Sequence, residues 1–210
     1  MELKELTEKT LAIFDANSPQ ELSDRIYKTV MGNGTEKYQA FIDLVDGDLS
    51  KDHMQKIYQY YQADRQNLGQ DYTPSSLARL VALLAGPSSK VIDMCAGSGA
   101  LTIQKWNEDK NASYICIERD EIVIPYLLFN LVIRNIDAEV QHKDVLTGEL
   151  FKAYRVHRGN AYGIVEVISC QQYPTHHTTS GGMHMTPIVW SRGLENLKYL
   201  QNRMLTMHSY

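Results

Sequence analysis

The chain has 210 residues, of which 43% are hydrophobic and 22% charged, and its formal net charge is −4. This length can bury one core with a small helical appendage, and the acidic balance argues against a strongly electrostatic nucleic-acid binder. No apolar run is long enough to span a bilayer, and residues 1–6 lack the apolar core of a signal peptide. We therefore expect a cytoplasmic protein that does not enter the membrane.

Residues 1–68 predict a helical region. The run 18–21, Ser-Pro-Gln-Glu, has the pattern of a capping box with proline at the first helical position. Ser50 is expected to cap a later helix of the same region. The buried face of the helix that starts near residue 19 is expected to consist of Leu22, Ile26 and Val30.

The next predicted helix begins near residue 73. Thr73 is a good N-cap and Pro74 suits the first helical position, although a plain helix start explains both residues equally well. Tyr72, Thr73 and Pro74 would then lie where the helix dipole favours the carboxylate of a bound ligand. The apolar stripe expected to pack across the following strand is Leu77, Leu80, Val81 and Leu84.

The run 91–101, Val-Ile-Asp-Met-Cys-Ala-Gly-Ser-Gly-Ala-Leu, predicts a buried strand, a glycine turn and the start of a helix. Glycine at 97 and 99 permits positive φ or close approach to a ligand, and the following helix N-terminus offers free N–H groups. An ordinary strand-to-helix turn would have the same pattern. A second predicted strand, 114–118, ends in Glu118, a carboxylate that can hold a ribose diol, and this favours a nucleotide-type cofactor.

The residues near the turn discriminate between cofactors. Thr102 stands where a dinucleotide fingerprint requires a small residue, and no lysine near Gly97 could meet the phosphates of ATP. S-adenosylmethionine has no phosphates and needs acceptors for its ribose and amino groups. Asp93, Glu118 and Asp144 suit that need, so we expect S-adenosylmethionine as the cofactor.

Four segments, taken in order, resemble the adenine-specific DNA N6-methyltransferases, particularly the modification subunits of type I restriction systems and similar phage enzymes. Residues 70–78 look like the upstream cofactor motif of that family, 93–101 like its glycine motif, Glu118 like its ribose acid, and 143–146 like the motif that meets the adenine ring. The resemblance implies a Rossmann-like methyltransferase core. The cofactor-binding residues that it implies are Tyr72, Thr73, Pro74, Asp93, Cys95, Ala96, Gly97, Ser98, Gly99, Glu118, Arg119, Asp144 and Val145.

The acceptor motif of that family, of the type Asn-Pro-Pro-Tyr, is absent from the chain. In family members it follows the fourth strand, where a side-chain acceptor binds the adenine amine and an aromatic ring stacks on the flipped base. Here the predicted strand 162–168 leads into Cys170-Gln171-Gln172-Tyr173. Of these residues only Tyr173 matches the family motif, and its ring would stack on the base. Gln171 or Gln172, or Ser169 before them, could supply the oxygen that accepts a hydrogen bond from the adenine amine.

The remaining residues carry an uneven charge and few motifs. Residues 151–210 hold six Lys and Arg against two acids, a balance of +4, so the first 150 residues carry 15 cations against 23 acids, or −8. These cations could contact DNA phosphates or form an ordinary solvated surface. Residues 186–190 predict a short strand. The spacing of Cys170, His176, His177 and His184 matches no metal site, so no metal is expected.

We predict an α/β protein with a helical region at 1–68 and a Rossmann-like methyltransferase core at 69–210, too short for a full methyltransferase sheet plus a target-recognition domain. The family resemblance implies that the helical region caps the cofactor and DNA side, while a scaffold or a dimerisation bundle is the alternative. One functional hypothesis is methylation of adenine in DNA, with RNA or protein as other acceptors. The other is a catalytically silent cofactor-binding or companion subunit. Expected partners are DNA and either a partner subunit or a second copy of the chain.

Overall fold

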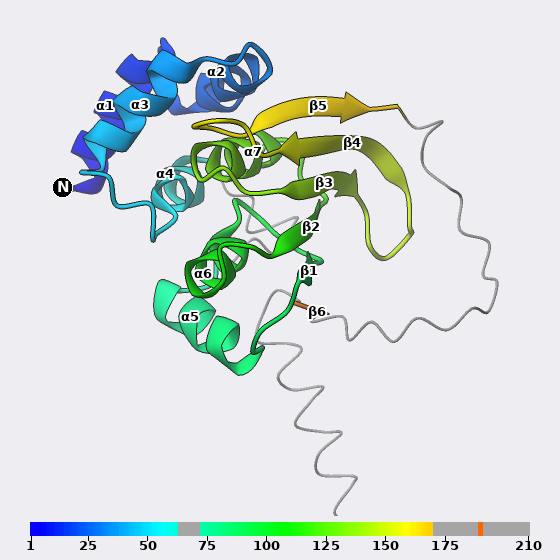
Figure 1. The fold of residues 1–210 in the computed structure, drawn as a ribbon. Coiled ribbons are helices and arrows are strands. Elements are labelled where there is room, and N and C mark those ends of the chain that lie inside the picture. Colours follow the sequence, from blue (N-terminus) through cyan, green and yellow to red (C-terminus); the bar gives the residue numbers. More distant parts are fainter. Residues whose placement is uncertain (63–71, 170–188, 191–210) are drawn as a thin grey trace, which may run out of the picture.

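The computed structural model describes residues 1–62, 72–169 and 189–190 (Figure 1). The helices are α1 (Leu3–Phe14), α2 (Pro19–Met31), α3 (Thr35–Leu44), α4 (His53–Tyr61), α5 (Ser75–Leu84), α6 (Ala100–Glu108) and α7 (Ile124–Ile133). The strands are β1 (Lys90–Asp93), β2 (Ser113–Glu118), β3 (Ala138–Lys143), β4 (Leu150–His157), β5 (Ile164–Ile168) and β6 (Val189–Trp190). The chain therefore has a mixed α/β fold, as the sequence predicts. Among the described helices, none combines the length and apolar character needed to cross a bilayer.

The strands form one sheet in the order β5-β4-β3-β2-β1-β6. β6, β1, β2 and β3 run parallel, whereas β4 and β5 are each antiparallel to the preceding strand. The link between β3 and β4, residues 144–149, is too short for the crossover that a parallel pair requires. The chain therefore turns back, with Gly148 at φ +79°.

This antiparallel hairpin corrects the expected alternation of helices and strands. The strand predicted at 162–168 is present as β5, and it lies at the edge of the sheet, separated from β1 by three strands. Its carboxyl end points the same way as the carboxyl ends of β1, β2 and β3, because two successive antiparallel pairings restore the direction. With strands about 4.8 Å apart, Ile168 lies about 19 Å from β1 across the sheet. The predicted strand at 186–190 is described only at β6, which pairs with β1.

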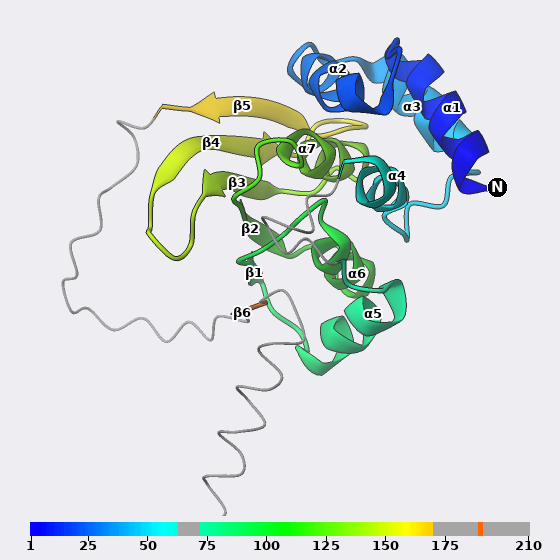
Figure 2. The same ribbon diagram turned by 180° about the vertical axis from the view of Figure 1, so that it is seen from behind.

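Helix α7 is the centre of the helical layer. Every residue of α7 is buried, and Figures 1 and 2 show α5, α6 and α7 on the same side of the sheet, with α1 to α3 beyond α7. The Phe129 ring of α7 meets Phe14 of α1 and Phe41 of α3 edge to face, with centroids 5.2 and 5.1 Å apart. Such pairs add to the free energy gained from burial alone. The N-terminal helices therefore share one hydrophobic core with α7.

One predicted helix cap is wrong and another is confirmed in position only. Ser18 occupies the N-cap position of α2, but its side chain makes no cap bond, and the Glu21 carboxylate accepts hydrogen bonds from the backbone and side chain of Asn17 instead of closing a capping box. Helix α4 is capped by Asp52, which accepts from the Gln55 N–H, and not by Ser50. The first helical proline of α2 and the burial of its predicted face, Leu22, Ile26 and Val30, are confirmed.

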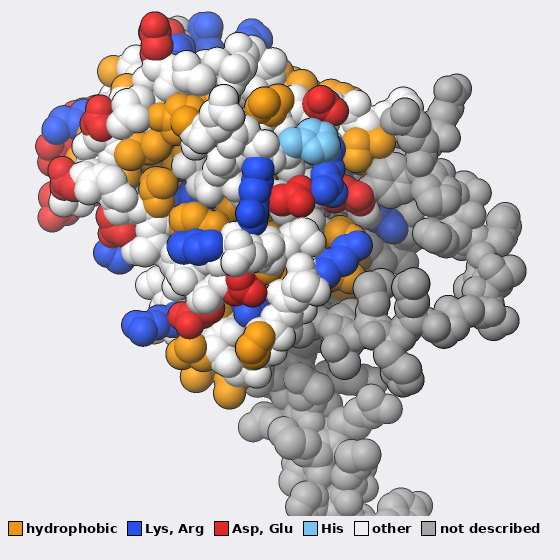
Figure 3. All heavy atoms as spheres, viewed as in Figure 1, with side chains coloured by type: hydrophobic (Ala, Val, Ile, Leu, Met, Phe, Trp, Pro, Cys, Tyr) orange, Lys and Arg blue, Asp and Glu red, His pale blue; other side chains and the backbone are white. Residues whose placement is uncertain are grey.

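The predicted buried face of α5 is wrong for its leucines, whereas Val81 is partly buried and packs against the core. The helix begins at Ser75 with Pro74 in the cap position, one residue later than expected. Its buried residues are Ala78 and Ala82, because small side chains let α5 approach α6 closely. The leucines point outward and leave hydrophobic side chains gathered over α5, at the lower end of the molecule in Figure 3. They are Leu77, Leu80, Leu83 and Leu84.

A matched pair of leucines tests this packing. Leu22 is fully buried between the helices, whereas Leu84 is 77% exposed. We expect Leu22→Ala to lower the free energy of unfolding by about 2–5 kcal/mol, because it removes apolar contacts and leaves a cavity. Leu84→Ala should change it by about 0.5 kcal/mol or less. Urea titrations followed by circular dichroism measure both values, and equal losses would contradict the arrangement of α2 and α5.

Candidate functional site

The glycine turn joins β1 to α6 at the carboxyl edge of the sheet. Gly97 has φ +57° and Gly99 has φ +100°, so both glycines adopt the left-handed backbone that the sequence predicts. A Cβ on Gly99 would lie 3.0 Å from Leu127 Cδ1 of α7. The Gly99 N–H closes the turn on the Ala96 carbonyl at 2.9 Å. Any larger residue at 99 would strain the backbone and crowd α7.

Glu118 holds this turn against the end of β2. Its Oε2 accepts the Gly97 N–H at 2.7 Å, and its Oε1 accepts the N–H groups of Arg119 and Asp120, each at 2.9 Å. The Ala96 N–H also donates to the Ile117 carbonyl. Hydrogen bonds to a carboxylate are stronger than neutral ones. The buried Glu118 side chain is therefore a fixed acceptor directly beside the turn.

Asp93 lies deeper than an open binding group would. Its side chain is fully buried, and its Oδ2 accepts a hydrogen bond from Thr102 Oγ1 at 2.9 Å. Thr102, the residue whose size disfavours a dinucleotide, thus ties α6 to the end of β1. Burial, followed by the neighbouring Asp93 charge, raises the pKa of the Cys116 thiol, which lies 3.5 Å from the same hydroxyl. The Asp93 carboxylate is therefore inside the protein, next to the start of α6, and not on the surface of the turn.

Asp144 joins the ends of β3 and β2. Its Oδ1 accepts the N–H groups of Leu146 and Thr147, and its Oδ2 lies 3.2 Å from Arg119 Nε. The backbone hydrogen bond from Leu146 is the largest cause that lowers the Asp144 pKa. The Arg119 carbonyl oxygen is also 2.9 Å from a ring nitrogen of His142. The predicted acids Glu118 and Asp144 therefore end neighbouring strands, with Val145 half-buried next in the chain.

The upstream motif is docked on helix α4. The Tyr72 ring lies edge to face with the ring of Tyr58, with centroids 5.6 Å apart. The Thr73 carbonyl accepts from Gln55 Nε2 at 3.3 Å. Tyr58 donates a short hydrogen bond to Asp120, two residues after Glu118. The helical region therefore contacts both the upstream motif and the end of β2.

A buried polar network that the sequence analysis missed connects the same region to the glycine turn. Ser98 Oγ donates to Asp52 Oδ2 at 2.6 Å, and Asn130 Nδ2 donates to both Asp52 Oδ1 and the Ser98 carbonyl, at 2.9 and 2.8 Å. Ser98 is 1% exposed. Its hydroxyl is therefore used within the protein, and only its backbone can face a ligand in the turn.

Arg134 completes this network from the end of α7. Its guanidinium donates to the Asn130 side chain and to three carbonyls, those of Leu49, Lys51 and Asn130. Burial lowers the pKa of Arg134 to about 10 and raises that of Asp52. The sequence contained a signal for this network, because Asn130 and Arg134 are polar residues four positions apart at the end of an otherwise apolar helix.

The predicted basic surface is only partly described. Arg155 forms an ion pair with Asp137 at 2.7 Å, Arg158 donates to the Lys110 carbonyl, and Lys152 donates to the Tyr27 hydroxyl. The other three cations lie outside the described residues: Arg192, Lys198 and Arg203. So do the residues predicted for catalysis: Gln171, Gln172 and Tyr173. Within residues 1–62 and 72–169, no three His, Cys, Asp or Glu side chains group closely enough to hold a metal ion.

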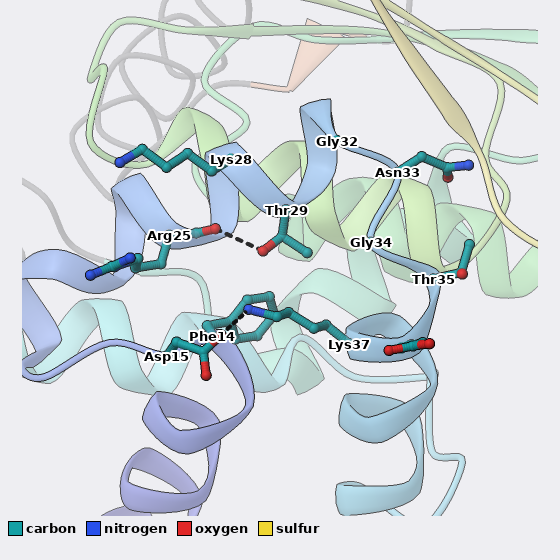
Figure 4. Close-up of a pocket in the computed structure, with 11 residues that line it drawn as sticks. Phe14, Asp15, Arg25, Lys28, Thr29, Gly32, Asn33, Gly34, Thr35 and Lys37 are labelled. Carbon is teal, nitrogen blue, oxygen red and sulfur yellow. Dashed lines mark hydrogen bonds and ion pairs between the residues drawn. The ribbon is translucent and has the colours of Figure 1, made fainter.

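Two cavities lie outside the glycine turn. The first, of about 510 Å³, opens between the end of α1, the end of α2 and the start of α3 (Figure 4). Lys37 reaches across it to Asp15, while Arg25 and Lys28 extend away from Thr35. These cations do not converge on one point, so they do not form an anion site. The second cavity, of about 750 Å³, lies between α2, the end of α4 and strands β3 and β4.

Comparisons with known proteins agree with the sequence resemblance. The model of the family described as N-6 DNA Methylase matches residues 46–176, more than half of the chain. The methylase subunit of the type I restriction enzyme MjaVII from Methanocaldococcus jannaschii is 28% identical over 122 residues. That alignment covers 55% of this chain and 21% of the archaeal protein, so the chain spans about a fifth of this relative. No solved structure gives a significant match.

Two substitutions at Asp52 test the buried network. Asp52→Ala would leave the donors of Ser98, Asn130 and Gln55 without their acceptor, so we expect a loss of about 3 kcal/mol in the free energy of unfolding. Asp52→Asn should lose less, because the Ser98 hydroxyl can rotate to accept from the new amide. Asp43→Ala is the control, since the Asp43 side chain is exposed and, within the described residues, accepts a hydrogen bond only from Gln39. Chemical denaturation that found Asp52→Ala as stable as the control would refute the network.

Proposed function

Because the chain belongs to the N-6 DNA methylase family, we propose that it binds S-adenosylmethionine at the carboxyl edge of β1, β2 and β3. The observation that carries this proposal is the glycine turn, held open by positive φ at two residues and fastened to the Glu118 carboxylate. Ligands of open α/β sheets bind at this edge. We accordingly interpret residues 69–210 as a Rossmann-like core and residues 1–68 as a helical region.

Each proposed cofactor residue has a role that its contacts support. Glu118 would accept the ribose hydroxyls, because its carboxylate ends β2 directly beside the turn. Asp144, on the next strand, would face the adenine, with Arg119 and Val145 beside it. The turn, Cys95 to Gly99, and the start of α5, Tyr72 to Pro74, would surround the methionine part. Asp93 would act as a positioning residue through Thr102.

The first candidate activity is methylation of adenine in DNA. The bound cofactor would supply an electrophilic methyl group to the exocyclic amine of the base. Tyr173 would stack on the base, and Gln171 or Gln172 would accept an amine hydrogen. Lys152 and the other cations of residues 151–210 would contact DNA phosphates.

The second candidate is a cofactor-binding companion subunit that does not methylate by itself. Two observations favour this candidate. The chain lacks an Asn-Pro-Pro-Tyr-type motif. Strand β5, which precedes the segment expected to replace that motif, is separated from β1 by three strands. The curated relative is itself named as a subunit. A partner subunit or a second copy of the chain would then complete the catalytic site.

Isothermal titration calorimetry tests the cofactor proposal. We expect the chain to bind S-adenosylmethionine, and Glu118→Gln to weaken binding about tenfold or more, because one acceptor oxygen becomes a donor. Glu108→Gln, at the exposed end of α6, should bind like the parent chain. Absence of binding by the parent, or equal affinity in the two variants, would reject the site.

Transfer of a labelled methyl group to unmethylated DNA separates the two candidate activities. An enzyme should incorporate label alone, and Tyr173→Ala should lower the rate because the base loses its stacking partner. A companion subunit should incorporate none alone and gain activity when cell extract supplies its partner. Lack of incorporation under both conditions would reject adenine methylation.

A further inference from the structure

The cavity between α2, α4 and the β3–β4 hairpin, which we call the tyrosine cavity, has features of a ligand site. Three of its lining residues are Tyr27, Tyr61 and Tyr154, from three different elements. Its volume of about 750 Å³ lies within the usual range for small-molecule sites. None of the residues proposed for S-adenosylmethionine lines it. It therefore does not include the glycine turn, although its lining residue His142 lies 2.9 Å from the carbonyl oxygen of Arg119 in the proposed cofactor site.

The walls of the tyrosine cavity are joined by hydrogen bonds between distant segments. Ser23 of α2 donates to the Ile122 carbonyl at 2.7 Å. Gln62, after α4, donates to the Pro19 carbonyl and accepts from the Tyr126 hydroxyl, both at 2.6 Å. These bonds connect α2, α4 and α7 around the opening. The cavity is thus preformed, which reduces the entropy lost when a ligand binds.

Lys152 supplies the cation of the tyrosine cavity. Its ammonium donates to the Tyr27 hydroxyl at 2.8 Å and lies 5.1 Å from the ring centroids of both Tyr27 and Tyr154. Within the described part of the chain it forms no ion pair with a carboxylate. An ammonium has three donors and Tyr27 uses one, so two can meet an anion such as a phosphate.

The other lining groups suit a nucleobase. Tyr61 is half-buried, and Ile124 and Pro125 form a buried apolar part of the wall. Asp24 and Glu121 are exposed lining residues. Asp24 could accept a hydrogen bond from an exocyclic amine, whereas Glu121 is close enough to Tyr154 to act on its hydroxyl electrostatically. A flat base can stack on an aromatic side chain, whereas a purely apolar ligand would desolvate Lys152 without giving it an anionic partner.

We propose that the tyrosine cavity binds a nucleotide, with an amine-bearing base beside Tyr61 and the phosphate at Lys152. The nucleotide could be free or part of a nucleic-acid strand, because both present the same base and phosphate. This second site does not depend on the cofactor proposal. It assigns to Lys152 a phosphate contact in a preformed cavity rather than on an open surface.

Calorimetry with deoxyadenosine monophosphate, deoxyadenosine and a deoxyadenosine tetranucleotide tests the proposal. We expect the monophosphate to bind about tenfold more tightly than deoxyadenosine, because only the monophosphate offers a charged partner to Lys152. Lys152→Met should abolish this preference and Tyr61→Leu should weaken both ligands. If the tetranucleotide binds more tightly than the monophosphate, the ligand is a nucleic-acid strand. If the two bind equally, the ligand is a free nucleotide.

A control variant shows whether nucleotide binding belongs to the tyrosine cavity. Lys110→Met removes a lysine that stacks on Trp106 outside the cavity and should leave nucleotide binding unchanged. Melting temperatures verify that each variant is folded. The proposal is overturned if the parent binds no nucleotide or if Lys152→Met binds nucleotide like Lys110→Met.

Discussion

The buried network of Asp52, Ser98, Asn130 and Arg134 is the constraint on which the rest of this structure depends. It brings a helix cap, the glycine turn and the end of the central helix together around two ionisable groups that are both removed from water. Buried polar groups are tolerated only when their hydrogen bonds are made. The network therefore favours one arrangement of the helical region over the sheet, and through Ser98 it also sets the position of the glycine turn.

A second constraint acts at the carboxyl edge of the sheet. Glu118 fastens the turn to β2, and Asp144 is linked to Arg119, so the ends of three parallel strands are connected by charged groups. Such an edge is rigid before any ligand arrives, and rigid sites lose less entropy on binding. The tyrosine cavity lies beyond this edge, where α2 and the β3–β4 hairpin meet. Both proposed sites thus rely on contacts between the helical region and the sheet.

Sheet topology separates the cofactor half of the site from the segment expected to accept the substrate. The short link after β3 permits only an antiparallel return, and β5 consequently lies at the outer edge of the sheet. The end of β5 is thus separated from β1 by the ends of three strands. The described fold therefore positions the residues proposed for the cofactor, whereas the residues proposed for catalysis lie outside the described part of the chain.

The sequence by itself determined the features that depend on neighbouring residues: the positive φ of Gly97 and Gly99, the acids that end β2 and β3, the first proline of α2, and the family. These follow from local sterics and from chain order. Only the tertiary structure decided that Asp52 caps α4 and bonds Ser98, that alanines rather than leucines of α5 are buried, and that Lys152 lies beside two tyrosine rings. The reason is physical, since each depends on which distant surfaces pack together, and neither periodicity nor spacing specifies that choice.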